Sequence, residues 1–345
     1  MRLLVYADLQ ATNGSEISYT DPTTTLQHLR VKKFFTDMAA IYAEHDCEGI
    51  IDLGDTTDDR SSIPIPTIEL VGEGLSLLPD SQWNIKLVGN HEQYLRSASI
   101  NNRHLFSHKF TVVDQNQVFT CGDTPMVFCS YPGDLTETTK WIDEQGRHLR
   151  SRAPVLFGHF QVAGCQMSNG LALTGVPRTA LKDYRVSLLG HIHIPQSIGD
   201  CIHYVGSPFQ QDWGETGQAK RVAIFDTESR QVEWIALSGY PVYKRISFEE
   251  FTALENAPEE NRYRVRLVDH TQAELFFQSP RFHRAEAEYA YTIAANEEVK
   301  QEQDWSFEGT CRRYIALVPP DKAGLSVTTD ELMDIGSAVA RGECS

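Results

Sequence analysis

Short apolar runs recur along the first two thirds of the chain, and each ends at a polar residue or a glycine. The first covers residues 1–7. The others lie in GIIDLG, NIKLVG, PMVFCSYP, PVLFGHF and VSLLGHIH, at 49–54, 84–89, 125–132, 154–160 and 186–193. Apolar runs of this length between polar or glycine positions are typical of buried strands.

Helical periodicity fills several of the intervals between these runs. It is clearest from about Thr24 to Ala43, where apolar residues recur near helical spacing at Leu26, Leu29, Phe34, Phe35 and Met38. Residues 66–78 and 135–150 also fit helices. Buried strands alternating with helices predict an α/β sandwich, with functional residues in the loops that follow the carboxyl ends of the strands.

The pattern changes near residue 241. Residues 262–270 alternate like a half-exposed strand, residues 285–300 alternate small and aromatic side chains, and residues 328–342 resemble a capped helix. We therefore expect two domains, a larger one over residues 1–241 and a smaller C-terminal one over residues 242–345.

Composition indicates a globular protein with a real core. The 345 residues are 41% hydrophobic and 23% charged. No apolar run approaches the roughly 18 residues that cross a membrane, and no basic-then-apolar leader begins the chain, so we expect a cytoplasmic protein without a membrane partner. The seven cysteines are scattered without a C-x-x-C pair. This spacing favours reduced thiols over disulfides or a thiolate zinc site.

The net charge of −16 argues against a broad basic face that grips nucleic acid. A phosphate-bearing ligand would therefore need positive charge from another source. Bound metal ions are one such source.

The polar residues at the strand ends form a ligand set for divalent metals. They combine carboxylates, amides and imidazoles, at Asp8, Gln10, Asp55, Asn90, His91, Glu92, His159, His191 and His193. Taken singly, each has a simpler explanation, since an aspartate at a strand end often caps a helix and a lone histidine often lies in a core. Their joint occurrence at successive strand ends predicts a site for Mn²⁺, Fe²⁺ or Zn²⁺.

The series D-x-Q, GDxxD, GNHE, GH and GHxH resembles the signature of the calcineurin-like metallophosphoesterases over about residues 1–213. The segments at 155–164 and 188–215, the latter with YVGSP and an acidic tail, are similar to SbcD-type nuclease subunits, including those of bacteriophage recombination endonucleases. The resemblance implies a metallophosphoesterase-type β-sandwich flanked by helices, with a smaller α+β cap.

The resemblance also implies roles for the site residues. Two divalent ions, Mn²⁺ first and Mg²⁺, Fe²⁺ or Zn²⁺ as alternatives, would share Asp55. One ion would add Asp8, Gln10 and His193, and the other would add Asn90, His159 and His191. His91 would bind no metal and would protonate the leaving oxygen of a phosphodiester.

Gln10 departs from the family pattern, in which most members carry histidine. An amide oxygen binds borderline ions less well than imidazole, so Gln10 predicts a weaker first metal site, or one biased toward Mn²⁺ or Mg²⁺.

Other positions have more modest interpretations. Asp58 and Asp59 fit supporting roles better than ligation, and Glu92 fits either an imidazole or an arginine partner. His203 and Trp213 fit packing, while Ser207, Gln210 and Gln211 fit a DNA path or a turn equally well.

The leading hypothesis is a DNA nuclease subunit that forms a homodimer and pairs with an SbcC-like ATPase, both implied by the resemblance alone. A second hypothesis is a phosphodiesterase or phosphatase for nucleotides or phosphoproteins, which the acidic net charge favours. A third is a metal-poor protein scaffold, for which Gln10 is the support.

Overall fold

The computed structural model divides the chain into two compact units, residues 1–290 and residues 291–345. It describes residues 1–14, 16, 18, 23–94, 100–168, 170–254, 260–279 and 285–289. The second unit, with the helix predicted at 328–342, lies outside the described residues. Everything below concerns the first unit.

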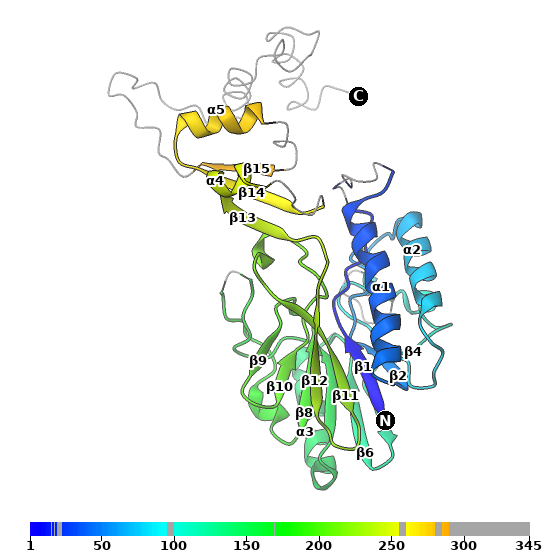
Figure 1. The fold of residues 1–345 in the computed structure, drawn as a ribbon. Helices are drawn as coiled ribbons and strands as arrows, with labels where there is room; N and C mark the ends of the chain where they lie inside the picture. Colours follow the sequence, from blue (N-terminus) through cyan, green and yellow to red (C-terminus); the bar gives the residue numbers. More distant parts are fainter. Residues whose placement is uncertain are drawn as a thin grey trace, which may run out of the picture. The chain divides into compact units, whose positions relative to one another are not determined.

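Two six-stranded sheets form the core of this unit (Figure 1). The first has the order β12, β11, β1, β2, β3, β4, with bounds Val232–Leu237, Lys220–Asp226, Arg2–Tyr6, Gly49–Asp52, Ile85–Leu87 and Thr111–Val113. The second has the order β5, β6, β7, β8, β10, β9, with bounds Gln117–Cys121, Thr124–Cys129, Val155–His159, Val186–Gly190, Ile202–Tyr204 and Gln196–Ile198. Strands β1 to β4 are parallel to one another, as are β6, β7, β8 and β10.

The buried side chains of the two six-stranded sheets and their helices form three hydrophobic clusters. Strand β1 is buried on both faces, with Leu3 and Val5 packed between the sheets and Leu4 and Tyr6 packed against helices. A strand covered on both sides is expected to be apolar throughout, which explains the opening run of the sequence. Each fully buried side chain of this size stabilises the fold by about 1.5–3 kcal/mol.

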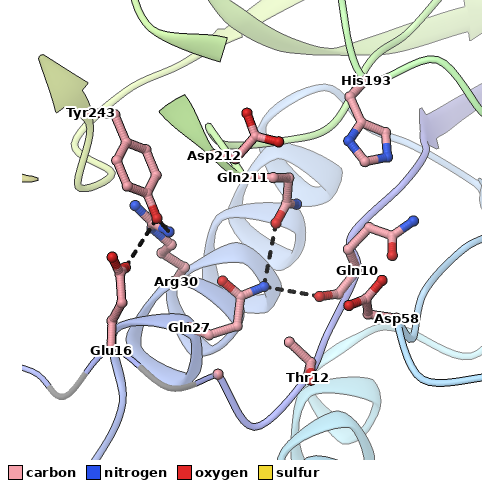
Figure 2. Close-up of a pocket in the computed structure, with 11 residues that line it drawn as sticks. Gln10, Thr12, Glu16, Gln27, Arg30, Asp58, His193, Gln211, Asp212 and Tyr243 are labelled. Carbon is pink, nitrogen blue, oxygen red and sulfur yellow. Dashed lines mark hydrogen bonds between the residues drawn. The ribbon is translucent and has the colours of Figure 1, made fainter. Parts of the chain in front are cut away.

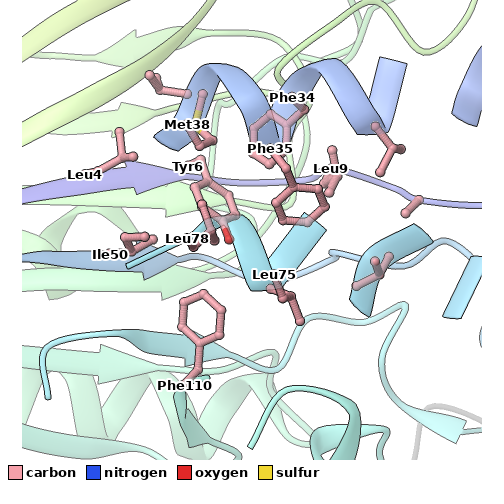
Figure 3. Close-up of a cluster of buried hydrophobic side chains, with 14 of the residues drawn as sticks. Leu4, Tyr6, Leu9, Phe34, Phe35, Met38, Ile50, Leu75, Leu78 and Phe110 are labelled. Carbon is pink, nitrogen blue, oxygen red and sulfur yellow. The ribbon is translucent and has the colours of Figure 1, made fainter. Parts of the chain in front are cut away.

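Helices α1 (Leu26–Glu44) and α2 (Ile65–Leu77) lie side by side on the outer face of the first sheet (Figure 1). The Thr25 side chain caps α1 by accepting from the backbone N–H of His28. Their apolar residues pack against β1 and β2, as Figure 3 shows for Phe34, Phe35 and Leu75. Helix α3 (Leu135–Leu149) covers the second sheet. The predicted α/β class, with sheets flanked by helices, is therefore confirmed.

Smaller elements complete the described part. Four 3₁₀ turns are η2 to η5, at Arg103–Leu105, Arg150–Arg152, Arg178–Leu181 and Trp213–Glu215. Strands β13 (Tyr243–Ser247), β14 (Arg262–Leu267) and β15 (Ala285–Tyr289) form a separate parallel sheet with helices α4 (Phe248–Thr252) and α5 (His270–Gln278). This sheet has its own hydrophobic cluster, although the predicted boundary at 241/242 stays a prediction.

Two further features bear on the sequence predictions. The five cysteines within the described ranges are all unpaired, as expected of reduced thiols. None of the described helices is both long and apolar enough to cross a membrane.

Gly74 lets α1 and α2 approach closely, and this makes a stability prediction. A Cβ at Gly74 would overlap the buried ring of Phe35, so we expect Gly74→Ala to lower the free energy of unfolding by about 1–3 kcal/mol. Gly72 lies two residues earlier in the same helix with no heavy atom near its Cβ direction. Gly72→Ala is therefore expected to stabilise by about 1 kcal/mol. Urea unfolding of both variants measures the difference, and equal effects would contradict this packing.

Candidate metal centre

The predicted ligands lie at the carboxyl ends of parallel strands from both sheets. In the first sheet, Asp8 and Gln10 follow β1, Asp55 follows β2, and Asn90 follows β3. In the second sheet, His159 is the last residue of β7, and His191 and His193 follow β8. Neighbouring parallel strands end at the same edge of a sheet, and this edge is where ligands collect in α/β folds.

The backbone at this edge is bent in an unusual way. Asp8, Gln10, Asp55 and His191 have φ angles of 54°, 53°, 56° and 82°. This left-handed region costs a non-glycine residue about 1–3 kcal/mol and is concentrated at functional sites. The first two turns support each other, because Asp8 N–H donates to Gly54 O (3.0 Å) and Gln10 N–H donates to Asp55 O (2.9 Å).

Two glycines of the motifs make room for the ligands. A Cβ at Gly89 would overlap the Asp55 carboxylate, and one at Gly54 would lie 2.7 Å from His159 Nδ1. Gly54 also has a φ of 104°, in the left-handed region that glycine adopts without strain. For Gly89 the requirement is close packing.

Asp55, Asn90, His159 and His191 converge on one point. The acceptor atoms of Asp55, His159 and His191 all lie within 4.8 Å of one another. His159 Nδ1 is 2.7 Å from Leu53 O, so that Nε2 faces Asp55 Oδ2 at 3.3 Å. The backbone carbonyl thus orients the ring so that Nε2 points toward Asp55.

The Asn90 amide completes this group. Its Oδ1 lies 3.1 Å from His159 Nε2 and 2.7 Å from His191 Nδ1. With the amide turned over, nitrogen takes that place and donates to the same two rings and to Asp55. A cation among these atoms would select the first orientation, because oxygen coordinates metals and an amide N–H does not.

The ionisable side chains of this group have pKa values that are shifted in different directions. Burial would raise the pKa of Asp55, but His159 outweighs it and holds the pKa below its ordinary value. Burial lowers the pKa of His159, while the Asp55 carboxylate overrides this and raises it to about 9. For His191, burial and then the charge on His159 lower the pKa to about 3. A neutral ring keeps the lone pair that a metal requires.

Asp8, Gln10 and His193 are the remaining residues of the predicted ligand set. Among the described residues, Asp8 Oδ2 and Gln10 Oε1 are buried atoms that accept no hydrogen bond. Gln10 Nε2 donates to Asp55 Oδ2 (3.2 Å), and Asp8 Oδ1 accepts from His191 N–H (2.9 Å). Burial raises the pKa of Asp8 to about 6, although the nearby His159 and His193 act to lower it. Buried acceptors without donors are costly, and a bound cation would satisfy them.

His91 stands beside these ligands with its own partners. Its backbone N–H donates to Asp55 Oδ1 (2.8 Å), while its Nδ1 lies 2.6 Å from Asp58 O and 3.0 Å from Asp58 Oδ1. Arg60, which the sequence interpretation missed, lies 3.3 Å from His91 Nε2. Burial lowers the pKa of His91, but Asp58 and then Asp55 outweigh it and raise the pKa above its ordinary value. Asp58 thus has the supporting contact predicted for it.

Among the described residues, Glu92 has no hydrogen bond to either of its predicted partners, an imidazole or an arginine. This buried carboxylate accepts from the backbone N–H groups of Asp55 (2.8 Å), Thr56 (2.6 Å) and Gly89 (2.7 Å), and from Lys86 Nζ (3.1 Å). It therefore ties the GDTT turn to the GNHE turn. Lys86 lies inside strand β3 among apolar residues, and nothing in the local sequence indicates its partner.

The remaining positions are mostly structural. His203 contacts Ser197 and the Trp234 ring, and Trp213 packs against Tyr243 with ring centroids 4.9 Å apart. Asp59 accepts from Thr12. Ser207 and Gln210 are buried and hydrogen-bonded within the protein. These contacts agree with the packing roles predicted for His203 and Trp213.

A pocket of about 410 Å³ opens beside Gln10 and His193 (Figure 2). Asp58, Gln27 and Gln211 also line it. Gln27 Nε2 donates to Gln10 O (2.9 Å) and approaches Gln211 Oε1 (3.5 Å), and these contacts join helix α1 to the first ligand turn. The pocket therefore lies directly beside two of the predicted ligands, Gln10 and His193.

Comparisons with known proteins place this geometry in context. Exonuclease subunit 1 of Enterobacteria phage T4 is 24% identical over 218 residues, which cover 59% of this chain and 62% of the relative. Putative phosphoesterase 078R of Invertebrate iridescent virus 3 is 26% identical over 202 residues, 55% of this chain and 57% of the relative. The matched regions thus span less than two thirds of either relative. No family model matches the sequence.

Solved structures with some likeness include a dimetal phosphatase from Danio rerio, with 13% identity, a TM-score of 0.39, and coverage of 69% of this chain and 99% of that one. A nuclease from Pseudomonas putida has 16% identity, a TM-score of 0.31, and coverage of 68% and 87%. The names of the two viral relatives, an exonuclease subunit and a phosphoesterase, agree with the resemblance that the sequence motifs carry.

Proposed function

We propose that this chain is a metal-dependent nuclease subunit that hydrolyses phosphodiester bonds in DNA. The observation that carries the proposal is the convergence of oxygen and imidazole ligands from five strand ends around Asp55, with His91 beside them and outside the ligand set. The orphaned acceptors of Asp8 and Gln10 support a cation at this place. The donor set suits Mn²⁺ best, with Mg²⁺, Fe²⁺ or Zn²⁺ as alternatives.

Two ions would share the Asp55 carboxylate. Asp8, Gln10 and His193 would complete the first metal site, and Asn90, His159 and His191 the second. When bound, such a pair neutralises the phosphodiester and stabilises the entering and leaving oxygens of an in-line displacement. Because the net charge of the chain is −16, this positive charge is needed for any nucleic-acid substrate.

His91 would donate a proton to the leaving oxygen. Asp58 contacts Nδ1, and Arg60 Nη2 lies 3.3 Å from Nε2, the nitrogen that would carry the transferred proton. The raised pKa of His91 favours the protonated ring that a general acid needs near neutral pH. Arg60 would add positive charge beside the phosphate.

The word "subunit" in the name of the phage relative supports a complex. We propose that the protein forms a homodimer and pairs with an SbcC-like ATPase through the region after residue 241. It would act in recombination, repair or DNA degradation. Its location would be cytoplasmic, in the host cytoplasm if a phage encodes it.

A second candidate is a phosphodiesterase or phosphatase for nucleotides or phosphoproteins. The phosphoesterase name of the second viral relative and the acidic net charge favour it. The scaffold alternative rested on Gln10. It is weakened because Gln10 is buried and turned toward Asp55, with Oε1 lacking a donor.

The deciding experiment compares two substrates. Purified protein with Mn²⁺ is given labelled linear duplex DNA and, separately, bis-p-nitrophenyl phosphate. We expect cleavage of DNA. Hydrolysis of the small ester without DNA degradation, even with the ATPase partner present, would favour the second candidate. Loss of both activities at full metal occupancy would favour the scaffold.

Gln10→His tests the first metal site directly. Imidazole binds borderline ions better than an amide oxygen does, so we expect Zn²⁺ and Mn²⁺ to bind about tenfold more tightly, or ~1.4 kcal/mol, relative to Mg²⁺. Titration calorimetry on the metal-free protein measures this preference. Gln231→His, at an exposed position, is the matched control. Unchanged preference in Gln10→His would mean that this side chain does not bind metal.

A further inference from the structure

Glu215 is a buried carboxylate that contacts a candidate metal ligand from behind. It ends the 3₁₀ turn η5 and is 2% exposed. Its Oε1 lies 3.1 Å from His193 Nδ1. Its Oε2 accepts from Lys220 Nζ (2.6 Å), Ser207 Oγ (3.2 Å) and the Gln211 N–H (3.0 Å). The carboxylate is thus fully engaged and cannot swing away from the histidine ring.

The same group of residues also holds the His193 backbone. Lys220 Nζ donates to His193 O (3.0 Å), and Ser207 N–H donates to the same oxygen (3.0 Å). We call Ser207, Gln211, Glu215 and Lys220 the Glu215 bracket. It fixes His193 at two points, its backbone carbonyl and its ring Nδ1. A side chain held at both points keeps one orientation without help from a ligand.

The bracket reaches the first strand as well. Gln211 Nε2 donates to Leu9 O (3.2 Å), in the turn that carries Asp8 and Gln10. The bracket therefore spans both halves of the proposed first metal site, His193 on one side and the Asp8–Gln10 turn on the other. It has no hydrogen bond to Asn90, His159 or His191 among the contacts of the described residues.

We infer that Glu215 is a positioning residue for His193 and that it sets the metal affinity of the first site. This inference rests on the proposed function. An ionised carboxylate at Nδ1 keeps the proton on that nitrogen, so the lone pair stays on Nε2, which can then bind the ion. Lys220 balances the charge of Glu215 in the interior, where an unpaired carboxylate would be costly. Glu215 is the acidic end of the segment 188–215, so this inference gives the end of that segment the role of positioning His193.

Glu215→Gln separates this role from a merely structural one. Lys220 Nζ is a pure donor, so the new amide must turn its oxygen toward Lys220 and its NH₂ toward His193. The NH₂ group would then donate to Nδ1 and move the ring proton to Nε2. Nitrogen-detected NMR of ¹⁵N-histidine-labelled protein without metal reports the tautomer, and the His193 signal is assigned by its loss in His193→Ala. We expect the Nδ1–H form in the parent and the Nε2–H form in the variant.

Metal binding is the second measurement. Mn²⁺ titration of metal-free Glu215→Gln is expected to show one of two sites weakened by about 10- to 100-fold, with the other unchanged. Glu69→Gln, an exposed change on α2, should leave both sites unchanged. In a His193→Ala background, Glu215→Gln should have no further effect on affinity, because the histidine ring through which Glu215 acts is absent.

The outcomes separate the two proposals. A parent protein that binds no pair of Mn²⁺ ions would overturn the proposed function. Two normal sites in the parent, together with unchanged tautomer and affinities in Glu215→Gln, would overturn the positioning role alone. A loss of affinity that persists in the His193→Ala background would also overturn it, since it would show a general structural effect.

Discussion

Replacing His91 with alanine is expected to lower the rate of phosphodiester cleavage by about 10²- to 10⁴-fold, the usual contribution of a general acid. Metal content should stay at the parent level. The reason is geometric, since the contact of His91 with Asp55 runs through the backbone N–H, which alanine keeps. The ring itself contacts Asp58 and Arg60.

Steady-state kinetics and elemental metal analysis of the same preparation check this result. His203→Ala is the matched control, because His203 contacts Ser197 and Trp234 away from the site and should leave the rate unchanged. If His91→Ala lost its metals, the ring would be a ligand and our assignment of a proton-donating role would be wrong.

Replacing Asp55 with asparagine is expected to abolish activity and to reduce metal binding from two ions to at most one. The change keeps the shape of the side chain and an oxygen that can accept from the His91 N–H. It removes the second oxygen and the charge, which the two proposed ions share. It also removes the partner that raises the pKa of His159.

Titration calorimetry and elemental analysis give the stoichiometry. Asp58→Asn is the control, since it changes a carboxylate three residues away in the same turn, one that contacts His91 and no proposed ligand. It should keep two ions. Two ions bound with parent affinities in Asp55→Asn would contradict the shared-carboxylate arrangement.

The residues of the candidate site could be grouped from the sequence because each lies at the end of its strand or in the turn just after it. An apolar run that ends in GDTT, GNHE or GHIH contains both the buried strand and the turn after it. The pairing of parallel strands then brings the turns together. Of the four predicted helices, the three that fall within the described residues lie within one or two residues of their predicted bounds, and α1 and α3 begin at side-chain caps.

The supporting contacts could not be predicted, because they join residues distant in sequence. Lys86 and Glu92 meet Asp52 and the Asp55 turn only once β2 and β3 pair. Glu215 meets His193 across 22 positions and an irregular turn. Strand β11 was also missed. It pairs antiparallel with β1, from which it is distant in the sequence. No local periodicity encodes such contacts.

The left-handed backbone at Asp8, Gln10, Asp55 and His191 has an evolutionary consequence. Glycine adopts these angles without strain, so a change to glycine there would relieve strain while removing a proposed ligand. Selection for heat tolerance alone would then drive the chain toward an inactive protein at these positions. The persistence of side chains there would require continued selection for activity, so a thermostability screen on this protein should also score catalysis.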